Sequence, residues 1–124
     1  MTKILIADDN AQVRAALRIC LELNPGWQVC GEAENGQGAI DMVQILQPDV
    51  VLLDYSMPIM NGLDAARVIS ERSPQCPLLM FTMFASQQLS TLAREAGIQA
   101  VISKDVGGMS AIIEAVRKAT RKVS

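Results

Sequence analysis

At 124 residues, half of them hydrophobic, the chain has the length and apolar content of one domain with a single core. With a net charge of −2 and a pI of about 5.0, the chain lacks the surplus of basic residues that is typical of a nucleic-acid-binding domain. No apolar stretch approaches the roughly 20 residues that span a bilayer. The absence of histidine excludes mechanisms that need an imidazole. The three cysteines lack metal-type spacing and are expected to be free thiols in a reducing cytoplasm.

Short apolar runs that each end in a polar residue predict buried strands of a parallel sheet. They lie at residues 4–7 before Asp8 and Asp9, 50–53 before Asp54, 78–81 before Thr82, and 100–103 before Lys104. Residues 27–33 alternate weakly between apolar and polar, which is typical of an edge strand.

Helical spacing of apolar residues separates the strands and predicts five helices. They are expected at residues 10–24, between Gly36 and Pro48, and at 63–72, 86–96 and 108–122. Asn10 is expected to cap the first helix, and Gly97 to end the fourth in a left-handed conformation. The fourth helix has the thinnest apolar stripe, which comprises Leu89, Leu92, Ala93 and Ala96. Residues 55–62 form a loop rich in apolar residues that are expected at the surface. The order is that of five βα units, an α/β fold.

Three carboxylates follow two of the predicted strands. Ligands of an open parallel sheet bind at the carboxyl ends of its strands, so Asp8, Asp9 and Asp54 are expected to lie together. Carboxylates held close together repel unless one keeps its proton or a cation binds. Oxygen-only ligands with room for water favour Mg²⁺, with Mn²⁺ or Ca²⁺ as substitutes. An acidic pair alone is more often a helix cap, but a third carboxylate on the central strand favours a metal site.

A hydroxyl and an amine complete the predicted edge. Thr82 can donate a hydrogen bond to a phosphate oxygen, and Lys104 can pair with phosphate as a point charge. An Asp beside Mg²⁺ can attack phosphorus to form an aspartyl phosphate. Either residue alone would be an ordinary turn or surface residue, so the prediction rests on their arrangement at strand ends.

These residues closely resemble the receiver domain of two-component response regulators along the whole chain, residues 1–124. The resemblance rests on Asp8 and Asp9, on Asp54 with Met57-Pro58 and Gly62 after it, and on Thr82 and Lys104. It implies a flavodoxin-like (βα)5 doubly wound parallel sheet with strand order 2-1-3-4-5. It also implies that Asp54 accepts a phosphoryl group from a sensor histidine kinase. Asp8, Asp9, Asp54 and the backbone carbonyl of Ser56 would then hold Mg²⁺.

The chain departs from many receivers at two positions. Lys104 is followed by Asp105 where many have proline, and Lys-Asp resembles the NarL/FixJ class, which carries a helix-turn-helix output domain. That class implies transcriptional output, DNA binding only through the missing output domain, and self-association on phosphorylation through helices one and five. Val101 occupies the switch position where receivers usually place Tyr or Phe, and a β-branched side chain cannot make that swing. The expected location is the cytoplasm, without membrane attachment.

Two other readings stay open. A haloacid-dehalogenase-type phosphohydrolase also uses Asp, Thr, Lys and Mg²⁺, but it has a second acid two residues after the nucleophile, where this chain has Ser56. A receiver that acts by docking on proteins, with or without phosphorylation, would keep the same fold. The resemblance implies no catalysis beyond the domain's own phosphorylation and dephosphorylation.

Overall fold

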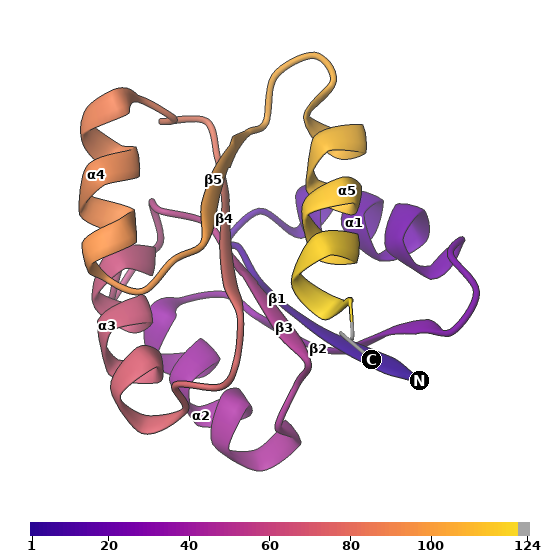
Figure 1. Ribbon diagram of the computed structural model, residues 1–124, viewed down its shortest axis with the longest axis horizontal. Coiled ribbons are helices and arrows are strands. Elements are labelled where there is room, and N and C mark those ends of the chain that lie inside the picture. Colours follow the sequence, from indigo (N-terminus) through magenta and orange to yellow (C-terminus); the bar gives the residue numbers. More distant parts are fainter. Residues whose placement is uncertain (122–124) are drawn as a thin grey trace.

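Five parallel strands form one sheet in the order β2-β1-β3-β4-β5 in the computed structural model, which describes residues 1–121 (Figure 1). The strands are β1 (Thr2–Ala7), β2 (Trp27–Ala33), β3 (Val50–Leu53), β4 (Leu78–Thr82) and β5 (Ala100–Ser103). The helices are α1 (Ala11–Glu22), α2 (Gly36–Leu46), α3 (Gly62–Arg72), α4 (Gln87–Glu95) and α5 (Gly108–Thr120). The predicted fold class and strand order are therefore confirmed.

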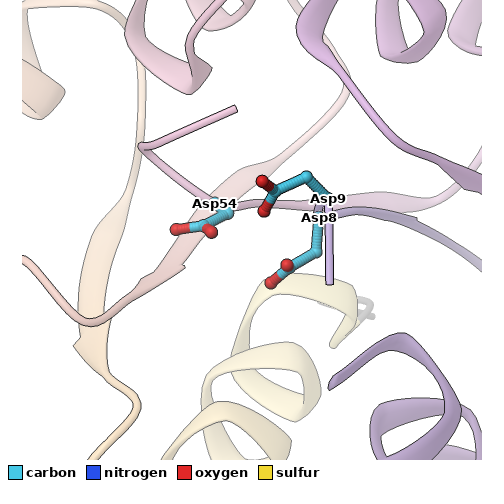
Figure 2. A group of neighbouring side chains, drawn as sticks. All are labelled: Asp8, Asp9 and Asp54. Carbon is cyan, nitrogen blue, oxygen red and sulfur yellow. The ribbon is translucent and has the colours of Figure 1, made fainter. Parts of the chain in front are cut away.

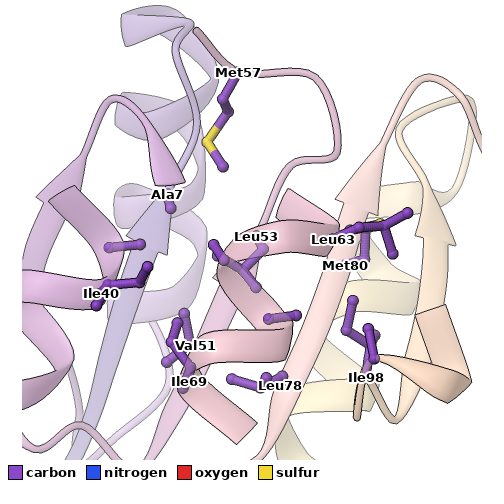
Figure 3. Close-up of a cluster of buried hydrophobic side chains, with 14 of the residues drawn as sticks. Ala7, Ile40, Val51, Leu53, Met57, Leu63, Ile69, Leu78, Met80 and Ile98 are labelled. Atoms are coloured by element: carbon purple, nitrogen blue, oxygen red, sulfur yellow. The ribbon is translucent and has the colours of Figure 1, made fainter. Parts of the chain in front are cut away.

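The sheet separates two hydrophobic clusters, because successive side chains of a strand point to opposite faces. One cluster lies under α2, α3 and α4 and includes Leu5, Val51, Leu53 and Met80, as Figure 3 shows in part. The other lies under α1 and α5 and includes Ile4, Ile6, Leu52, Leu79 and Phe81. Figure 1 shows the same division, with α1 and α5 on one side of the sheet and the other three helices opposite. Coverage of both faces explains why the inner strands are continuous apolar runs.

Side chains cap four of the described helices at their N-termini. The Asn10 side chain accepts hydrogen bonds from the backbone N–H groups of Gln12 and Val13, as predicted. Asn35, Asn61 and Ser86 cap α2, α3 and α4 in the same way. Each cap fixes the point at which a strand-end loop turns into a helix, and so it fixes the loops that surround the carboxyl edge of the sheet.

Three expectations need correction. Leu92 is 43% exposed, whereas Leu89 and Ala93 of α4 and Ala96 at its C-terminal end are buried, so the buried stripe is narrower than the apolar one. In the loop after Asp54, Ile59 is 84% exposed as expected, but Met57 is buried in the core (Figure 3). The fifth helix ends at Thr120, and Lys122, its predicted end, lies outside the described residues.

Gly97 has the predicted positive φ of 92°. Among the described residues, no helix is long and apolar enough to cross a membrane.

Candidate functional site

Asp8, Asp9 and Asp54 converge at the carboxyl edge of the sheet, as the sequence predicts. Each offers one carboxylate oxygen, and these three oxygens lie within 4.8 Å of one another (Figure 2). The convergence results from topology, because β1 and β3 are neighbours and their ends are in register, with Ala7 opposite Leu53. Asp8 and Asp54 are buried, whereas Asp9 is exposed. The arrangement places three negative charges around one small space.

Lys104 joins two of these acids. Its ammonium group lies 2.5 Å from Asp8 Oδ2 and 3.1 Å from Asp54 Oδ2, and its side chain is 9% exposed. The other oxygen of Asp54, Oδ1, is buried and has no hydrogen-bond partner among the described residues. A buried carboxylate oxygen without a donor is costly, so this one indicates a place for a cation or a ligand hydrogen-bond donor.

The burial of Asp54 raises the pKa of its carboxyl group, and the neighbouring Asp8 carboxylate acts in the same direction. The Lys104 ammonium and, to a smaller extent, the nearby Thr82 hydroxyl lower this pKa without overcoming both effects. Ionised Asp54 is therefore less favourable in the folded chain than in the unfolded one, because the raised pKa is a property of the folded state.

This shift predicts a pH-dependent gain in stability for Asp54→Asn in metal-free buffer. Above the folded pKa, wild-type folding bears the full cost of the ionised carboxylate. Below the ordinary carboxyl pKa of about 4 the group is protonated and that cost is absent. The gain in stability should therefore appear as the pH rises from about 4 through the raised pKa of the folded state. Urea unfolding of both proteins from pH 3.5 to 8 measures the difference. The exposed Asp41→Asn serves as the control, and an equal gain in that variant would contradict the assignment.

Thr82 lies at the end of β4 and is completely buried. Its hydroxyl oxygen accepts a hydrogen bond from the backbone N–H of Phe84 at 3.2 Å, so the hydroxyl proton stays available for another acceptor. The Phe84 ring packs edge-on against Tyr55, with ring centroids 6.3 Å apart. The loops after β3 and β4 therefore meet beside the site.

Three other residues of the predicted site or its motif lie around this centre. Ser56 is exposed, two residues beyond Asp54 in the loop between β3 and α3. Val101 lies on the edge strand β5 and is half-buried against the cluster under α2, α3 and α4. Gly62 begins α3, and a Cβ there would lie 2.1 Å from the Asp54 carbonyl oxygen. The backbone at Asp54 is thus held by a close approach that glycine permits.

Arg14 is a neighbour of the site that the sequence motifs do not indicate. Its Nη1 donates a hydrogen bond of 2.7 Å to the Asp8 carbonyl oxygen, and its Nε donates to Glu32 on β2 at 3.0 Å. The sequence does show an arginine in the first turns of the helix after the acidic pair. A prediction of its contacts would also have required the register of β1 and β2, which places Glu32 beside Ile6.

The donor set fits a hard divalent cation. The three grouped acids offer oxygens alone, one of them lacks a hydrogen-bond partner, and the exposed Asp9 leaves one side open to water. Magnesium favours this combination of few carboxylates and retained waters. The structure thus brings together the three acids that the sequence groups at this edge, Asp8, Asp9 and Asp54.

Comparison with known proteins gives the family. Residues 4–117 match the family model described as the response regulator receiver domain. The chain belongs to this family. The resemblance predicted from the residues is therefore confirmed, and the receiver fold accounts for the strand order and for the acidic edge.

Individual relatives are longer proteins of different kinds. A transcriptional regulatory protein of Bacillus subtilis, YdfI, is 36% identical over 105 residues, which are 85% of this chain and 49% of that protein. A protein-glutamate methylesterase/protein-glutamine glutaminase of Pyrococcus horikoshii is 47% identical over 85 residues, 68% of this chain and 23% of that enzyme. The solved signal receiver domain of NarL from Mycobacterium tuberculosis is 26% identical, with a TM-score of 0.89 over 96% of this chain and 95% of that one. The chain thus spans less than half the length of these two curated relatives.

Proposed function

We propose that this receiver is a phosphorylation-dependent switch in which Asp54 accepts a phosphoryl group from a sensor histidine kinase. The observation that carries the proposal is the buried Asp54 carboxylate, which has one oxygen unpartnered among the described residues and the other against Lys104. A carboxylate oxygen of Asp54 attacks phosphorus, the bond from phosphorus to its donor breaks, and an aspartyl phosphate forms.

The neighbouring side chains have separate roles. Lys104 lies where its ammonium group can pair with a phosphoryl oxygen on Asp54, and Thr82 can donate its hydroxyl proton to another. Asp8, Asp9, Asp54 and the Ser56 carbonyl would hold Mg²⁺, which neutralises charge on the phosphoryl oxygens when bound. Asp9 is the better direct ligand, since its carboxylate forms no hydrogen bond among residues 1–121, whereas Asp8 is occupied by Lys104 and the Asn10 N–H.

The same geometry supports a route from the site to the surface. A Thr82 hydroxyl drawn toward a phosphoryl group would leave the Phe84 N–H, and the start of the loop before α4 would move with it. That helix has two buried residues, Leu89 and Ala93, so its displacement costs less than that of a more deeply packed helix. Val101 offers no aromatic ring to follow the threonine, so the switch here relies on the loop at Met83 and Phe84 and on the surface of α4 and β5.

The proposed output is transcription through a helix-turn-helix domain that would follow residues 1–124. The support is the Lys104-Asp105 pair, the likeness to YdfI and to the NarL receiver, and the acidic charge of this chain, which favours DNA contact elsewhere. Self-association on phosphorylation would use α1, where Ile19 is 66% exposed, and Leu23 at its end, which is 77% exposed. The phosphohydrolase reading is not favoured, because Ser56 cannot act as the second acid.

Incubation with acetyl phosphate and Mg²⁺, followed by intact mass measurement, tests the proposal. We expect a persistent adduct of about 80 Da that excess chelator prevents. Rapid release of phosphate without an adduct would indicate a phosphohydrolase. The absence of both would leave a docking receiver that acts without phosphorylation.

A further inference from the structure

Among residues 1–121, Arg14 is the one side chain that ties the turn carrying the acidic pair to the edge of the sheet from outside the site. Its side chain is 12% exposed, and its guanidinium links the turn after β1 to acidic residues at the end of β2. Nη1 donates to the Asp8 carbonyl oxygen at 2.7 Å, Nε donates to Glu32 at 3.0 Å, and Nη2 lies 3.6 Å from Glu34. A planar guanidinium with several donors holds a carbonyl in one direction, which a lysine ammonium does not.

The Asp8 carbonyl belongs to the peptide group that joins Asp8 to Asp9, and this group determines the position of the Asp9 backbone. Because the peptide unit is planar, holding this oxygen also holds the amide and Cα of Asp9. The rest of Asp8 is already tied, since its N–H donates to the Ala33 carbonyl and its Oδ1 accepts from the Asn10 N–H. Asp9 has no such ties in the described part of the chain, so the position of its carboxylate depends on this peptide plane.

From these contacts we infer that Arg14 is a positioning residue for cation binding: it orients the Asp8–Asp9 peptide so that the Asp9 carboxylate meets the other two acids. The inference rests on the proposed magnesium site. It assigns to Arg14 no contact with the ion.

The sign of the effect separates positioning from electrostatics. Arg14 is a positive charge beside a site for a cation, so its loss would strengthen Mg²⁺ binding if charge alone acted. Loss of orientation has the opposite result, because substitutions among the partners that orient metal ligands typically lower affinity by about 10-fold or more. Weaker Mg²⁺ binding in a variant that has lost a nearby positively charged side chain is therefore evidence of positioning.

Arg18 offers a matched control on the same helix. Its Nε and Nη2 donate to Glu32 at 3.0 and 2.7 Å, so it shares the carboxylate that Arg14 uses, but its Nη1 bonds to the carbonyl of Val29 rather than that of Asp8. Arg14→Met and Arg18→Met each remove one charge and one partner of Glu32. They differ in the contact to the acidic turn and in one further ion pair each, Arg14 with Glu34 and Arg18 with Glu22.

Calorimetric titration with MgCl₂ of the wild type, Arg14→Met, Arg14→Lys and Arg18→Met tests the inference. We expect Arg14→Met to raise the Mg²⁺ dissociation constant roughly tenfold. Arg14→Lys should raise it at least as much, because the ammonium group keeps the repulsive charge without holding the carbonyl in one direction, whereas Arg18→Met should match the wild type. In metal-free amide NMR spectra, the Asp9 and Asn10 signals should shift in Arg14→Met and stay unchanged in Arg18→Met. Thermal unfolding of each variant verifies that it is folded.

The possible failures are distinguishable. Equal or tighter Mg²⁺ binding by Arg14→Met, or an equal loss in Arg18→Met, would overturn the role of Arg14 while the magnesium site stands. A wild-type chain that binds no Mg²⁺ would instead remove the proposed site, and the inference with it.

Discussion

Asp54→Asn is expected to abolish phosphorylation by acetyl phosphate, leaving no adduct of about 80 Da in the intact mass. The amide nitrogen and oxygen keep the shape of the carboxylate but lack its nucleophilic charge, so the step that forms the aspartyl phosphate has no attacking group. The stability of the folded state should not fall, because the substitution removes a buried charge whose pKa is raised by burial.

Asp64→Asn is the matched control for this experiment. Asp64 lies in the first turn of α3, is exposed and pairs with Arg67 at 2.7 Å, away from the acidic group. This variant should be phosphorylated like the wild type. Labelling that persists in Asp54→Asn would show that another residue accepts the phosphoryl group, and peptide mapping after borohydride reduction would locate it.

Gly62→Ala should damage both the fold and the site. The added Cβ would lie 2.1 Å from the Asp54 carbonyl oxygen and 3.1 Å from the terminal methyl of Met80. A backbone oxygen cannot retreat as a flexible side chain can, so α3 or the end of β3 must shift. We expect a loss of about 3 kcal/mol in unfolding free energy, at the upper end for overpacking. A shift of about 1 Å at the nucleophile would slow phosphorylation by about 100-fold.

Gly38→Ala tests whether this loss comes from the close contact rather than from the type of substitution. A Cβ at Gly38 would meet Ala33 and Asn35 at an ordinary 3.5 Å. Alanine in α2 should therefore leave stability unchanged or raise it by about 0.5–1 kcal/mol. Urea unfolding and the acetyl phosphate assay apply to both variants. A Gly62→Ala protein as stable and as reactive as Gly38→Ala would contradict the packing argument.

Much of the fold could be predicted, because its strands carry clear local signals. The bounds of β2, β3 and β5 correspond to short runs flanked by turn residues, and Asn10 and Gly97 mark helix ends by their own chemistry. Leu92 could not be placed with the same security. Helical spacing predicts which side of a helix faces the core, but not how wide the buried part of that side is. That width depends on how α4 packs on the sheet.

The site was predictable to the level of its residue types. Parallel strands bring Asp8, Asp9 and Asp54 to one edge whatever their side-chain conformations. Contacts that depend on side-chain conformation were beyond prediction, such as the bridge from Lys104 to two acids and the unpartnered oxygen of Asp54 among the residues described. Arg14 was missed for a related reason, since its contact with Glu32 depends on the register of two strands and the phase of a helix.

The bridge from Lys104 to Asp8 also bears on how the domain folds. The two residues are 96 positions apart, and Lys104 follows the edge strand β5 while Asp8 follows β1, with β3 and β4 between them in the sheet. Contacts of such long sequence separation form late, because the chain must first close the loops between them. Until β5 docks, Asp8 and Asp54 lack their ammonium partner, so an emerging or truncated chain holds an incomplete site. Competence to accept a phosphoryl group should therefore arise with the last βα unit, and it would serve as a chemical marker of complete folding.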